Sequence, residues 1–454
     1  MPSQSLSNSE LEPVISKEKQ IVLVWAITTW LVVMNTTMFN IALPSVLLEL
    51  SISSSLASWI VSGYSIAFAI STLTFSRLSD FIPISRLILM GLSILAVSSI
   101  AGLFTNQFYS LLAARIFQAI GAGAVPGLGM IVAGRFIPLS RRGRAMAIIA
   151  SGASLGFGLG PVIGGLVTEF LGWKYLFAVT ALVLFFIPFY KTLLPKEHIV
   201  QGRFDFTGVI LTALSVTSAL LFFSSFSIYL FFFTVVLLFI WWRYLNKKDE
   251  PFIRPQLLCN RQYRKLLIIG FTAYLFNFSN LFLMPIILTN EFGRSPAEVG
   301  MIIFPGAIIA VIAGQFIGRQ IDKRGTKPIM FYGHASLAVS LLMYAFFSSV
   351  AHYYILGTYL FASSGFAAIN SSVSNEVSRI LSRDEIGAGL GIVQLCQFIG
   401  GAFGVTVSGI LLTLQEGMIS AVIYRNIYLV IFTFIVIAIL FQYSYYSRAK
   451  TNVI

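Results

Sequence analysis

The sequence predicts an all-α polytopic membrane protein with fourteen transmembrane helices in a six, two, six arrangement and with both termini in the cytoplasm. Hydrophobic residues make up 57% of the 454 residues and charged residues 10%, against about 45–50% and about 25% in soluble domains. The apolar residues gather in segments that reach the length of about 20 residues needed to cross a bilayer. Lys and Arg gather at every second connection between these segments.

Each apolar segment is expected to be helical, because hydrocarbon offers the backbone no hydrogen-bonding partner outside the segment itself. The runs are too long and too continuously apolar for the alternating strands of an outer-membrane barrel. In chain order the predicted helices cover residues 21–43, 57–76, 87–104, 108–134, 145–171, 174–194, 206–225, 227–246, 265–289, 297–318, 328–349, 352–375, 386–413 and 423–446.

The distribution of positive charge predicts the orientation. If the N-terminus lies inside, the inner segments hold 26 of the 30 Lys and Arg residues, and the outer ones keep Lys174, Arg294 and Arg425. Lys and Arg are retained on the cytoplasmic side of short loops. Adding or removing one helix would scramble this alternation, so the pattern supports an even number of helices and a multi-pass protein of the cell membrane with both ends inside.

The hydrophilic stretches divide the chain into blocks. A loop repeat supports the division, since Ser76–Asp80 follows the second helix and Gly318–Gly325 follows the second helix of the last block. Repeated halves around a midplane site are typical of secondary transporters, and the two helices between them are expected to lie outside the transport machinery. The predicted parts are a cytoplasmic tail (1–20), a six-helix bundle (21–195), two additional helices (205–246), a cytoplasmic linker (247–264), a second six-helix bundle (265–446) and a second tail (447–454).

The two repeated loops each place one acid among bases. An acid in such a place can bind bases in one conformation and release them in another, which makes a latch. The alternative is a solvated loop with weak surface ion pairs. The residues are Asp80 with Arg77 and Arg86, and Asp322 with Lys323, Arg324 and Lys327.

The fifth predicted helix carries an unusual run of glycines around a proline. Glycines at these spacings let a neighbouring backbone come close, and a proline inside a helix removes a hydrogen bond. Ordinary small-residue packing is the alternative. We expect a conformational role for Gly156, Gly158, Gly160, Pro161, Gly164 and Gly165.

Polar residues inside the spans are the candidate substrate site. Arg115 lies several residues into the fourth helix, where an unpaired cation costs about 3 kcal/mol or more, unless it snorkels to the interface. Amides and hydroxyls in lipid need partners, either neighbouring helices or a cavity that holds a ligand. The candidates are Asn35, Thr37, Asn40, Arg115, Gln118, Asn277, Asn280, Asn370, Gln394 and Gln397, with Tyr64, Tyr274, Phe276 and Phe398 as possible aromatic walls.

Other chemistries find no support in the sequence. A phosphate-binding glycine loop that ends in Lys-Ser or Lys-Thr is absent. His198, His334 and His352 are scattered, and Cys259 and Cys396 lie far apart. The basic residues lie between apolar runs rather than in a nucleic-acid-binding motif. We therefore expect a protein that is not an enzyme, with no cofactor, metal or nucleic-acid partner, and leave the oligomeric state open.

Together these features resemble the fourteen-helix drug/proton antiporters of the major facilitator superfamily, over nearly the whole chain from Val22 to Tyr445. The glycine–proline run is similar to that family's antiporter signature, and Asn35–Pro44 resembles its first-helix motif. Arg115–Gly165 and Phe204–Asp205 are similar to Gram-positive tetracycline and phenicol exporters. The resemblance implies proton-coupled drug efflux by alternating access in the membrane of a Gram-positive bacterium.

This chain lacks acids at positions where the tetracycline exporters that it resembles have them. The tetracycline exporters have acids in helices 1, 5 and 13, where this chain has Asn35–Thr37, Phe157 and Gly400–Gly401, and no Asp or Glu falls in the middle of any predicted span. A cationic substrate needs a carboxylate to offset its desolvation. A neutral phenicol is therefore favoured over tetracycline. A tetracycline or multidrug antiporter, and an uncoupled facilitator or lipid flippase, remain alternatives.

Proton coupling then needs a titrating group elsewhere. Glu376, near the inner end of the twelfth helix, is the first candidate, because Ser372, Ser374 and Asn375 lie beside it. The alternative is a surface acid paired with Arg379 or Arg383. The remaining candidates are Arg115, the edge acids Asp80 and Asp322, and His334, because an imidazole titrates near neutral pH.

Overall fold

The computed structural model describes residues 17–195, 204–382 and 385–449, and helices are the only regular secondary structure in these ranges. The helices are α1 (Glu18–Leu50), α2 (Ser54–Leu78), α3 (Ile84–Leu103), α4 (Phe108–Ala122), α5 (Ala124–Phe136), α6 (Leu139–Phe170), α7 (Tyr175–Ala181), the 3-10 turn η1 (Leu182–Phe186), α8 (Ile187–Leu193), α9 (Phe206–Ser225), α10 (Ile228–Lys247), α11 (Pro255–Cys259), α12 (Arg261–Phe292), α13 (Pro296–Arg324), α14 (Thr326–Phe347), α15 (His352–Ile380), α16 (Ile386–Leu414) and α17 (Ser420–Ala449).

Local sequence sets several of these boundaries. Asn260 and Ser295 accept backbone N–H groups at the starts of α12 and α13, and Glu298 completes a capping box with Ser295. Gly293 ends α12 with φ 59°, a left-handed conformation in which glycine avoids the strain of a side chain. The short link from α12 to α13 therefore folds as a sharp reversal.

Thirteen helical segments in the described part of the chain are long and apolar enough to cross a membrane, with α4–α5 and α7–α8 each counting as one. They match thirteen of the predicted spans. The twelfth predicted span corresponds to α15, which has 29 residues but is rich in Ser and Asn. It packs against α12, α13 and α14, so protein rather than lipid contacts much of its polar surface. Its crossing of the bilayer, and with it the count of fourteen, stays a prediction.

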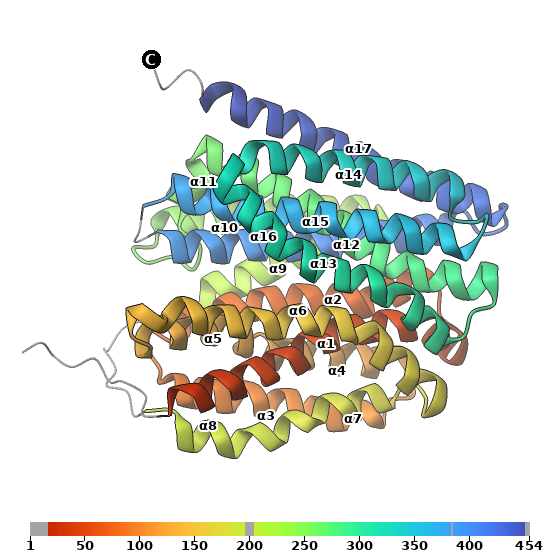
Figure 1. The fold of residues 1–454 in the computed structure, drawn as a ribbon. Helices are drawn as coiled ribbons and strands as arrows, with labels where there is room; N and C mark the ends of the chain where they lie inside the picture. The colour runs from red at the N-terminus through yellow and green to blue at the C-terminus, as the bar shows by residue number, and fades with distance from the viewer. Residues whose placement is uncertain (1–16, 196–203, 383–384, 450–454) are drawn as a thin grey trace, which may run out of the picture.

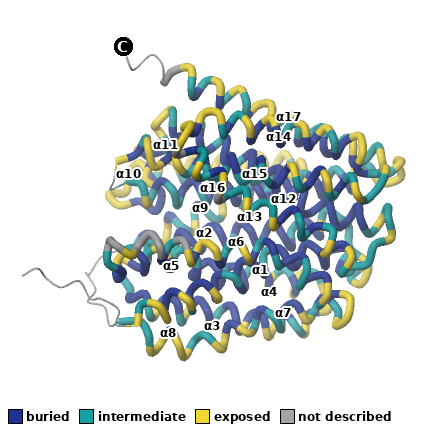
Figure 2. Tube along the Cα trace, in the orientation of Figure 1, coloured by how far each residue is buried: buried dark blue, intermediate teal, exposed yellow. Residues whose placement is uncertain are grey.

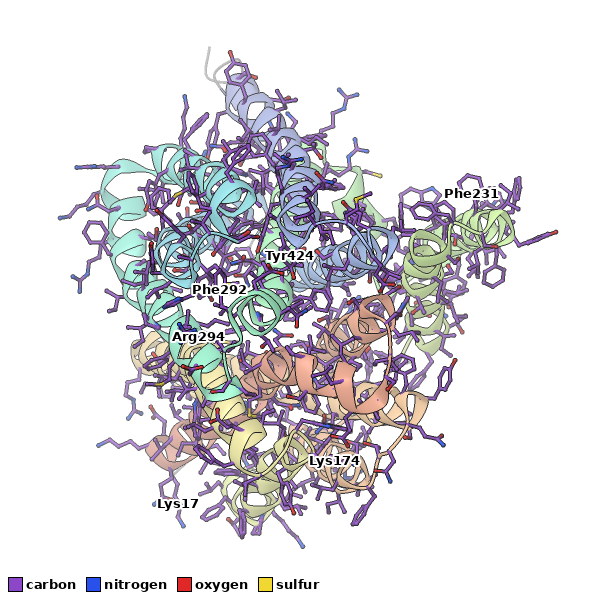
Figure 3. All side chains as sticks on the ribbon, turned by 90° about the vertical axis from the view of Figure 1, so that its right-hand side faces the viewer. Lys17, Lys174, Phe231, Phe292, Arg294 and Tyr424 are labelled. Carbon is purple, nitrogen blue, oxygen red and sulfur yellow. The ribbon has the colours of Figure 1, made fainter. Side chains whose placement is uncertain are left out.

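The helices form two bundles, α1–α8 and α12–α17, with the α9–α10 hairpin beside them (Figure 1). The hairpin was predicted to lie outside the transport machinery, and its two helices differ in this respect. α9 packs against α2 of one bundle and α16 of the other, whereas α10 packs mainly against α9. Figure 3 shows Phe231, at the start of α10, projecting away from both bundles. Only the outer helix of the hairpin is thus peripheral.

The start of α1 and the end of α17 lie at the same end of the molecule, on the left of Figure 1. We call this end the terminus side and the other the opposite side. Burial is concentrated inside each bundle, and exposed residues lie along the outer faces (Figure 2). The exposed outer face of α10 carries apolar side chains such as Phe232, Val236 and Phe239, which suits contact with lipid. The cytoplasmic location of the terminus side remains a prediction.

The two bundles are joined in the opposite half of the molecule. Ser62 Oγ donates to Ala402 O at 2.9 Å, and Thr406 Oγ1 donates to Ser62 Oγ at 3.0 Å, which joins α2 to α16. Glu169 at the end of α6 accepts hydrogen bonds from Ser295 Oγ and Ala297 N, at 2.7 and 2.9 Å, at the start of α13. Such contacts are expected of a carrier that is closed on the opposite side.

Candidate functional site

A cavity of about 330 Å³ lies between the bundles, midway along the helices that form it. Its walls come from α1 and α6 of one bundle and from α12, α13 and α15 of the other. None of the described residues that line it is charged. The lining side chains that carry polar groups or aromatic rings are Thr37, Phe157, Tyr274, Asn277, Phe278, Tyr359, Ser363, Phe366, Asn370 and Ser371.

Three of the predicted substrate-binding residues, Thr37, Asn277 and Asn370, line this cavity. Gln397 of α16 contributes indirectly, because its Nε2 donates to Asn370 Oδ1 at 3.0 Å. This bond fixes the orientation of the Asn370 amide. The ring of Tyr274 lies 5.2 Å from that of Phe366. The cavity therefore combines a few oriented amides with aromatic walls, as small-molecule sites generally do.

The glycines of α6 allow the close approach of α1 that forms one wall. A Cβ added at Gly156 would lie 2.7 Å from Trp30 O, and one added at Gly164 would lie 2.8 Å from Met38 O. A Cβ at Gly160 would overlap Thr37 Oγ1. α6 runs through Pro161 without ending. Thus the run, predicted to permit close backbone contact, is the surface on which α1 and α6 meet.

Further members of the run face the other bundle. A Cβ at Gly165 would overlap Pro296 O, and one at Gly300 would overlap Pro161 O. Gly158 instead faces Ala307 across a gap, since its added Cβ would be 3.8 Å from the Ala307 Cβ. The α6–α13 contact is therefore tight on the opposite side and looser at the level of the cavity.

Arg115 lies outside the cavity, inside the first bundle, where it is 1% exposed. Its Nη1 donates to Asn35 Oδ1 at 3.2 Å and to Gln118 Oε1 at 2.9 Å. Gln118 Nε2 donates onward to Ser99 Oγ at 2.7 Å. Asn35 and Gln118, predicted to bind substrate, are thus held by Arg115 away from the cavity lining.

The charge of Arg115 is accommodated by rings rather than by an acid. The guanidinium carbon lies 4.0 Å from the ring centroids of both Phe39 and Tyr64, and each such contact stabilises a desolvated cation by about 2 kcal/mol or more. Arg115 has no salt bridge among the residues that the structure describes. The aromatic contacts continue from Tyr64 through Phe68 to Phe398 of the second bundle, which also contacts the cavity residue Tyr274 at 5.7 Å.

Glu376 is 0% exposed and lies between α14, α15 and α17. One carboxylate oxygen accepts a hydrogen bond from Thr326 Oγ1. The other accepts one from Tyr445 OH at 2.7 Å. Arg379 Nη1 lies 3.4 Å away, and its side chain is 65% exposed. The acid thus has the Arg379 partner of the alternative hypothesis, but it is buried rather than on the surface. Arg383, the other possible partner, lies outside the described residues.

The remaining amides and His334 occupy separate places. Asn280 of α12 bonds with Tyr344 OH at 3.1 Å and Tyr428 OH at 3.3 Å inside the second bundle. The side chain of Asn40 is buried with no partner for Oδ1 among the described residues, and Gln394 is half-buried on α16. His334 is 1% exposed, its Nδ1 lies 3.1 Å from Met330 O, and it faces Gln442 of α17.

In the loop after α2, Asp80 has a different partner from the predicted Arg77 and Arg86. Asp80 Oδ1 accepts from Arg135 Nη2 at 2.6 Å, and Arg135 Nη1 also donates to Ser79 O at 2.8 Å. Arg77 instead donates to Pro251 O, in the stretch after α10, at 2.9 Å. The side chain of Asp322 lies outside the described residues, so the pairing predicted for Asp322 in the second loop stays a prediction.

Some site residues were not predicted from the sequence. Thr326, Gln442 and Tyr445 surround Glu376 and His334, yet each looks like an ordinary residue of an apolar helix. Gln442 carried a usable signal, because it is an amide inside the last apolar run. Asp205 is a buried N-cap that also accepts from Tyr244 OH at 2.5 Å and Phe252 N at 2.9 Å, and so ties α9, α10 and the following stretch together.

With two six-helix bundles around a midplane cavity, the architecture is that of a secondary transporter. The sequence profile of the Major Facilitator Superfamily matches residues 25–248 and 266–452, so the chain belongs to this superfamily. As a member it is a membrane carrier of small molecules and not an enzyme.

Several relatives are carriers with a stated activity. The riboflavin transporter RibZ of Clostridioides difficile is 27% identical over 75% of this chain and 76% of its own length. The multidrug resistance protein Stp of Mycobacterium tuberculosis is 24% identical over 84% of this chain and 73% of its own.

Solved structures show the same fold. A POT family transporter in complex with 5-aminolevulinic acid superposes with a TM-score of 0.72, at 14% identity, over 95% of this chain and 98% of its own. A D-xylose–proton symporter superposes with a TM-score of 0.68, at 16% identity, over 94% and 97%. At these identities the likeness concerns the fold alone.

Proposed function

We propose that this protein exports neutral, amphiphilic antibiotics from the cell, phenicols such as chloramphenicol and florfenicol first among them, in exchange for protons. Transport would proceed by alternating access, with the two bundles rocking about the midplane cavity. The terminus side would face the cytoplasm of a Gram-positive bacterium, because the Lys and Arg residues are concentrated there.

The observation that carries the proposal is the uncharged lining of the cavity. Thr37, Asn277 and Asn370 offer hydroxyl and amide groups, and Tyr274 and Phe366 offer rings, but no described residue of the lining is an acid or a base. A phenicol has an aromatic ring, hydroxyl groups and an amide, and no charge at neutral pH. It can therefore pair with the amides and stack on the rings without leaving an ion unpaired in a cavity that offers no opposite charge.

The same lining argues against the alternatives that involve cations. A metal-bound tetracycline or a cationic multidrug substrate would enter a cavity whose described residues offer no carboxylate, at a desolvation cost that only pairing offsets. The name of the multidrug resistance protein Stp supports drug export as a class. It does not separate neutral from cationic drugs.

A riboflavin-like substrate is a second candidate. RibZ, a relative at 27% identity, is a riboflavin transporter. A flavin is also neutral, aromatic and rich in hydroxyls, and its ring system suits the walls formed by Tyr274, Phe278 and Phe366. Transport of labelled riboflavin, measured beside that of labelled phenicol, separates the two candidates.

The test is expression in a drug-sensitive host with a matched empty vector. Raised resistance to chloramphenicol or florfenicol, with lower accumulation of the labelled drug, is the expected outcome. Resistance to tetracycline without resistance to either phenicol would contradict the proposal. Growth of a riboflavin auxotroph at low riboflavin would favour the flavin candidate. Phenicol export that persists when a protonophore collapses the proton gradient would favour an uncoupled facilitator or flippase.

A further inference from the structure

A second group of buried polar side chains, which we call the polar pocket, lies inside the C-terminal bundle, apart from the substrate cavity. Three helices contribute to it. α14 presents Thr326 and His334, α15 presents Ser372 and Glu376, and α17 presents Gln442 and Tyr445. Within each helix these residues are three, four or eight positions apart, so they lie on one face. The pocket therefore runs along the three-helix contact from the level of Glu376 to that of His334, roughly 12 Å deeper.

Glu376 closes the end of this pocket toward the terminus side. Its carboxylate is fully buried, yet Arg379, one turn later on the same helix, is 65% exposed and lies 3.4 Å from it. The carboxylate is therefore separated from water by little more than that exposed side chain. A fully buried acid is costly unless it is paired or protonated, so its burial marks a candidate functional site.

The deeper part of the pocket contains polar atoms without partners. His334 Nε2, both polar atoms of the Gln442 amide and Ser372 Oγ are buried and make no hydrogen bond to the described part of the chain. Buried polar groups are normally satisfied, and where protein atoms do not do so, ordered water does. The concentration of such atoms beside a buried acid indicates a place for water between α14, α15 and α17.

We propose that this pocket is the proton-binding site of the carrier, with Glu376 as the group that takes the proton and His334 as a relay at its inner end. The inference rests on the proton coupling in the proposed function and assigns its location. Water entering past Arg379 delivers one proton to the carboxylate, which becomes neutral. Its release restores the carboxylate, so charge and atoms balance over the cycle.

The groups around Glu376 suit a proton better than a metal cation. From α15 it faces the guanidinium of Arg379, and from α14 and α17 it faces the hydroxyls of Thr326, Tyr445 and Tyr446. The ammonium of Lys327 lies 6.0 Å from the ring of Tyr446. A sodium ion would share the site with this positive charge, whereas a proton removes the negative charge and leaves the hydroxyl contacts in place.

The position of Glu376 on α15 links the pocket to substrate. The preceding turns of α15 carry Tyr359, Ser363 and Asn370, which line the substrate cavity. Ionised, Glu376 holds α15 to α14 through Thr326 and to α17 through Tyr445. Neutralisation weakens these charge-assisted bonds. It thereby frees the helix that contacts the drug to shift relative to the rest of its bundle.

The decisive experiment uses the full-length carrier in proteoliposomes and compares wild type with Glu376→Gln. Drug exchange at equal pH on both sides requires no net proton movement, whereas accumulation driven by an imposed pH gradient does. We expect Glu376→Gln to retain exchange and to lose gradient-driven accumulation. Glu385→Gln, at a half-buried acid just before α16, is the matched control and should leave both unchanged.

A drug-independent readout separates failure of this inference from failure of the proposed substrate. A pH jump followed by infrared difference spectroscopy should show a protonated-carboxyl band in wild type that is missing in Glu376→Gln. Glu376→Asp, which keeps a carboxyl group if the Gln variant folds poorly, should shift that band and restore part of the accumulation. Gradient-driven accumulation by Glu376→Gln, an unchanged carboxyl band, or a signal that requires sodium would each overturn the inference.

Discussion

Arg115 of α4 places its guanidinium carbon 4.0 Å from the ring centroid of Tyr64 of α2, in the interior of the first bundle. Phe39 covers the other side at the same distance. A buried cation is thus held between rings and amides without a carboxylate among the residues described. The arrangement fixes α1, α2 and α4 relative to one another beside the wall of the substrate cavity.

Arg115→Gln is expected to abolish transport and to lower thermal stability. The variant removes the donor to Gln118 Oε1 and leaves that buried oxygen unsatisfied, at a cost of about 1–3 kcal/mol. Asn35 Oδ1 loses the same donor but keeps the hydrogen bond from Thr180 Oγ1 at 3.1 Å. Drug efflux and the detergent-solubilised melting temperature measure the two effects. Arg115→Lys should rescue little, because an ammonium lacks the planar group that stacks between the rings. Full activity of the Lys variant would contradict a role for stacking.

Two substitutions of Tyr64 test the contact between its ring and Arg115. Tyr64→Phe keeps the ring and removes the 3.4 Å hydrogen bond from Asn35, so its destabilisation should be about 0.5–1.5 kcal/mol, with efflux retained. Tyr64→Leu removes the ring. It should destabilise the protein more than Tyr64→Phe does, because both the cation–π contact and the aromatic packing are lost. Equal effects of the two variants on the melting temperature would show that the ring does not support Arg115.

Placing a charge in the cavity tests the basis of substrate choice. Asn277→Asp puts a carboxylate among lining residues that, where described, are uncharged, and we expect phenicol efflux to fall about tenfold or more. Export of a lipophilic cation such as ethidium should appear in the same variant. Asn290→Asp, at the exposed end of α12, is the control. Unchanged selectivity in Asn277→Asp would remove the uncharged lining as the reason for a neutral substrate.

The α1–α6 contact predicts different outcomes for two neighbouring glycines. Gly160→Ala places a methyl group against Thr37 Oγ1, whereas Gly158→Ala places one 3.8 Å from Ala307. Overpacking of this kind costs about 1–3 kcal/mol. Gly160→Ala should therefore lower both the melting temperature and efflux, and Gly158→Ala should leave stability near wild type. Measurement of both variants in one preparation provides the comparison, and a reversed order would contradict the close packing of α1 against α6.

A cross-link across the opposite side should arrest the carrier. The Cβ of a residue replacing Gly409 would lie 2.7 Å from Ser58 Cβ, so two cysteines there need only a small shift to reach the Cβ separation of about 3.5–4.5 Å in disulfides. In a Cys259→Ser, Cys396→Ser background, Ser58→Cys with Gly409→Cys should oxidise readily. Transport should stop and return on reduction. Each single cysteine is the control, and transport by the fully cross-linked protein would exclude closure at this point as a step of the cycle.

The sequence predicted much of the fold because hydrophobic length and the placement of Lys and Arg are one-dimensional signals. α15 is the predicted span that these signals mark least clearly, since its Ser and Asn residues lower its apolar character. The packing of α9 against both bundles was missed. Its sequence is simply apolar, and nothing in such a run says which surface of the protein it covers.

The site was predicted less completely, because polar residues in a span do not reveal which neighbours they face. Asn277 and Asn370 both reach the cavity, but Asn280, three residues after Asn277, turns into the second bundle toward Tyr344 and Tyr428. Asn35 pairs with Arg115 instead of lining the cavity. Such partners lie on other helices, so only their arrangement in three dimensions separates a substrate ligand from an interhelical hydrogen bond.

The most direct measurement of proton-coupled phenicol export uses everted membrane vesicles energised by respiration, with the internal acidification followed by a fluorescent dye. Chloramphenicol, florfenicol, tetracycline and riboflavin are added in turn. We predict that either phenicol dissipates the pH gradient in vesicles that contain the protein and not in vesicles that lack it. An unaltered gradient with both phenicols, alongside protonophore-insensitive movement of labelled drug, would contradict proton-coupled export.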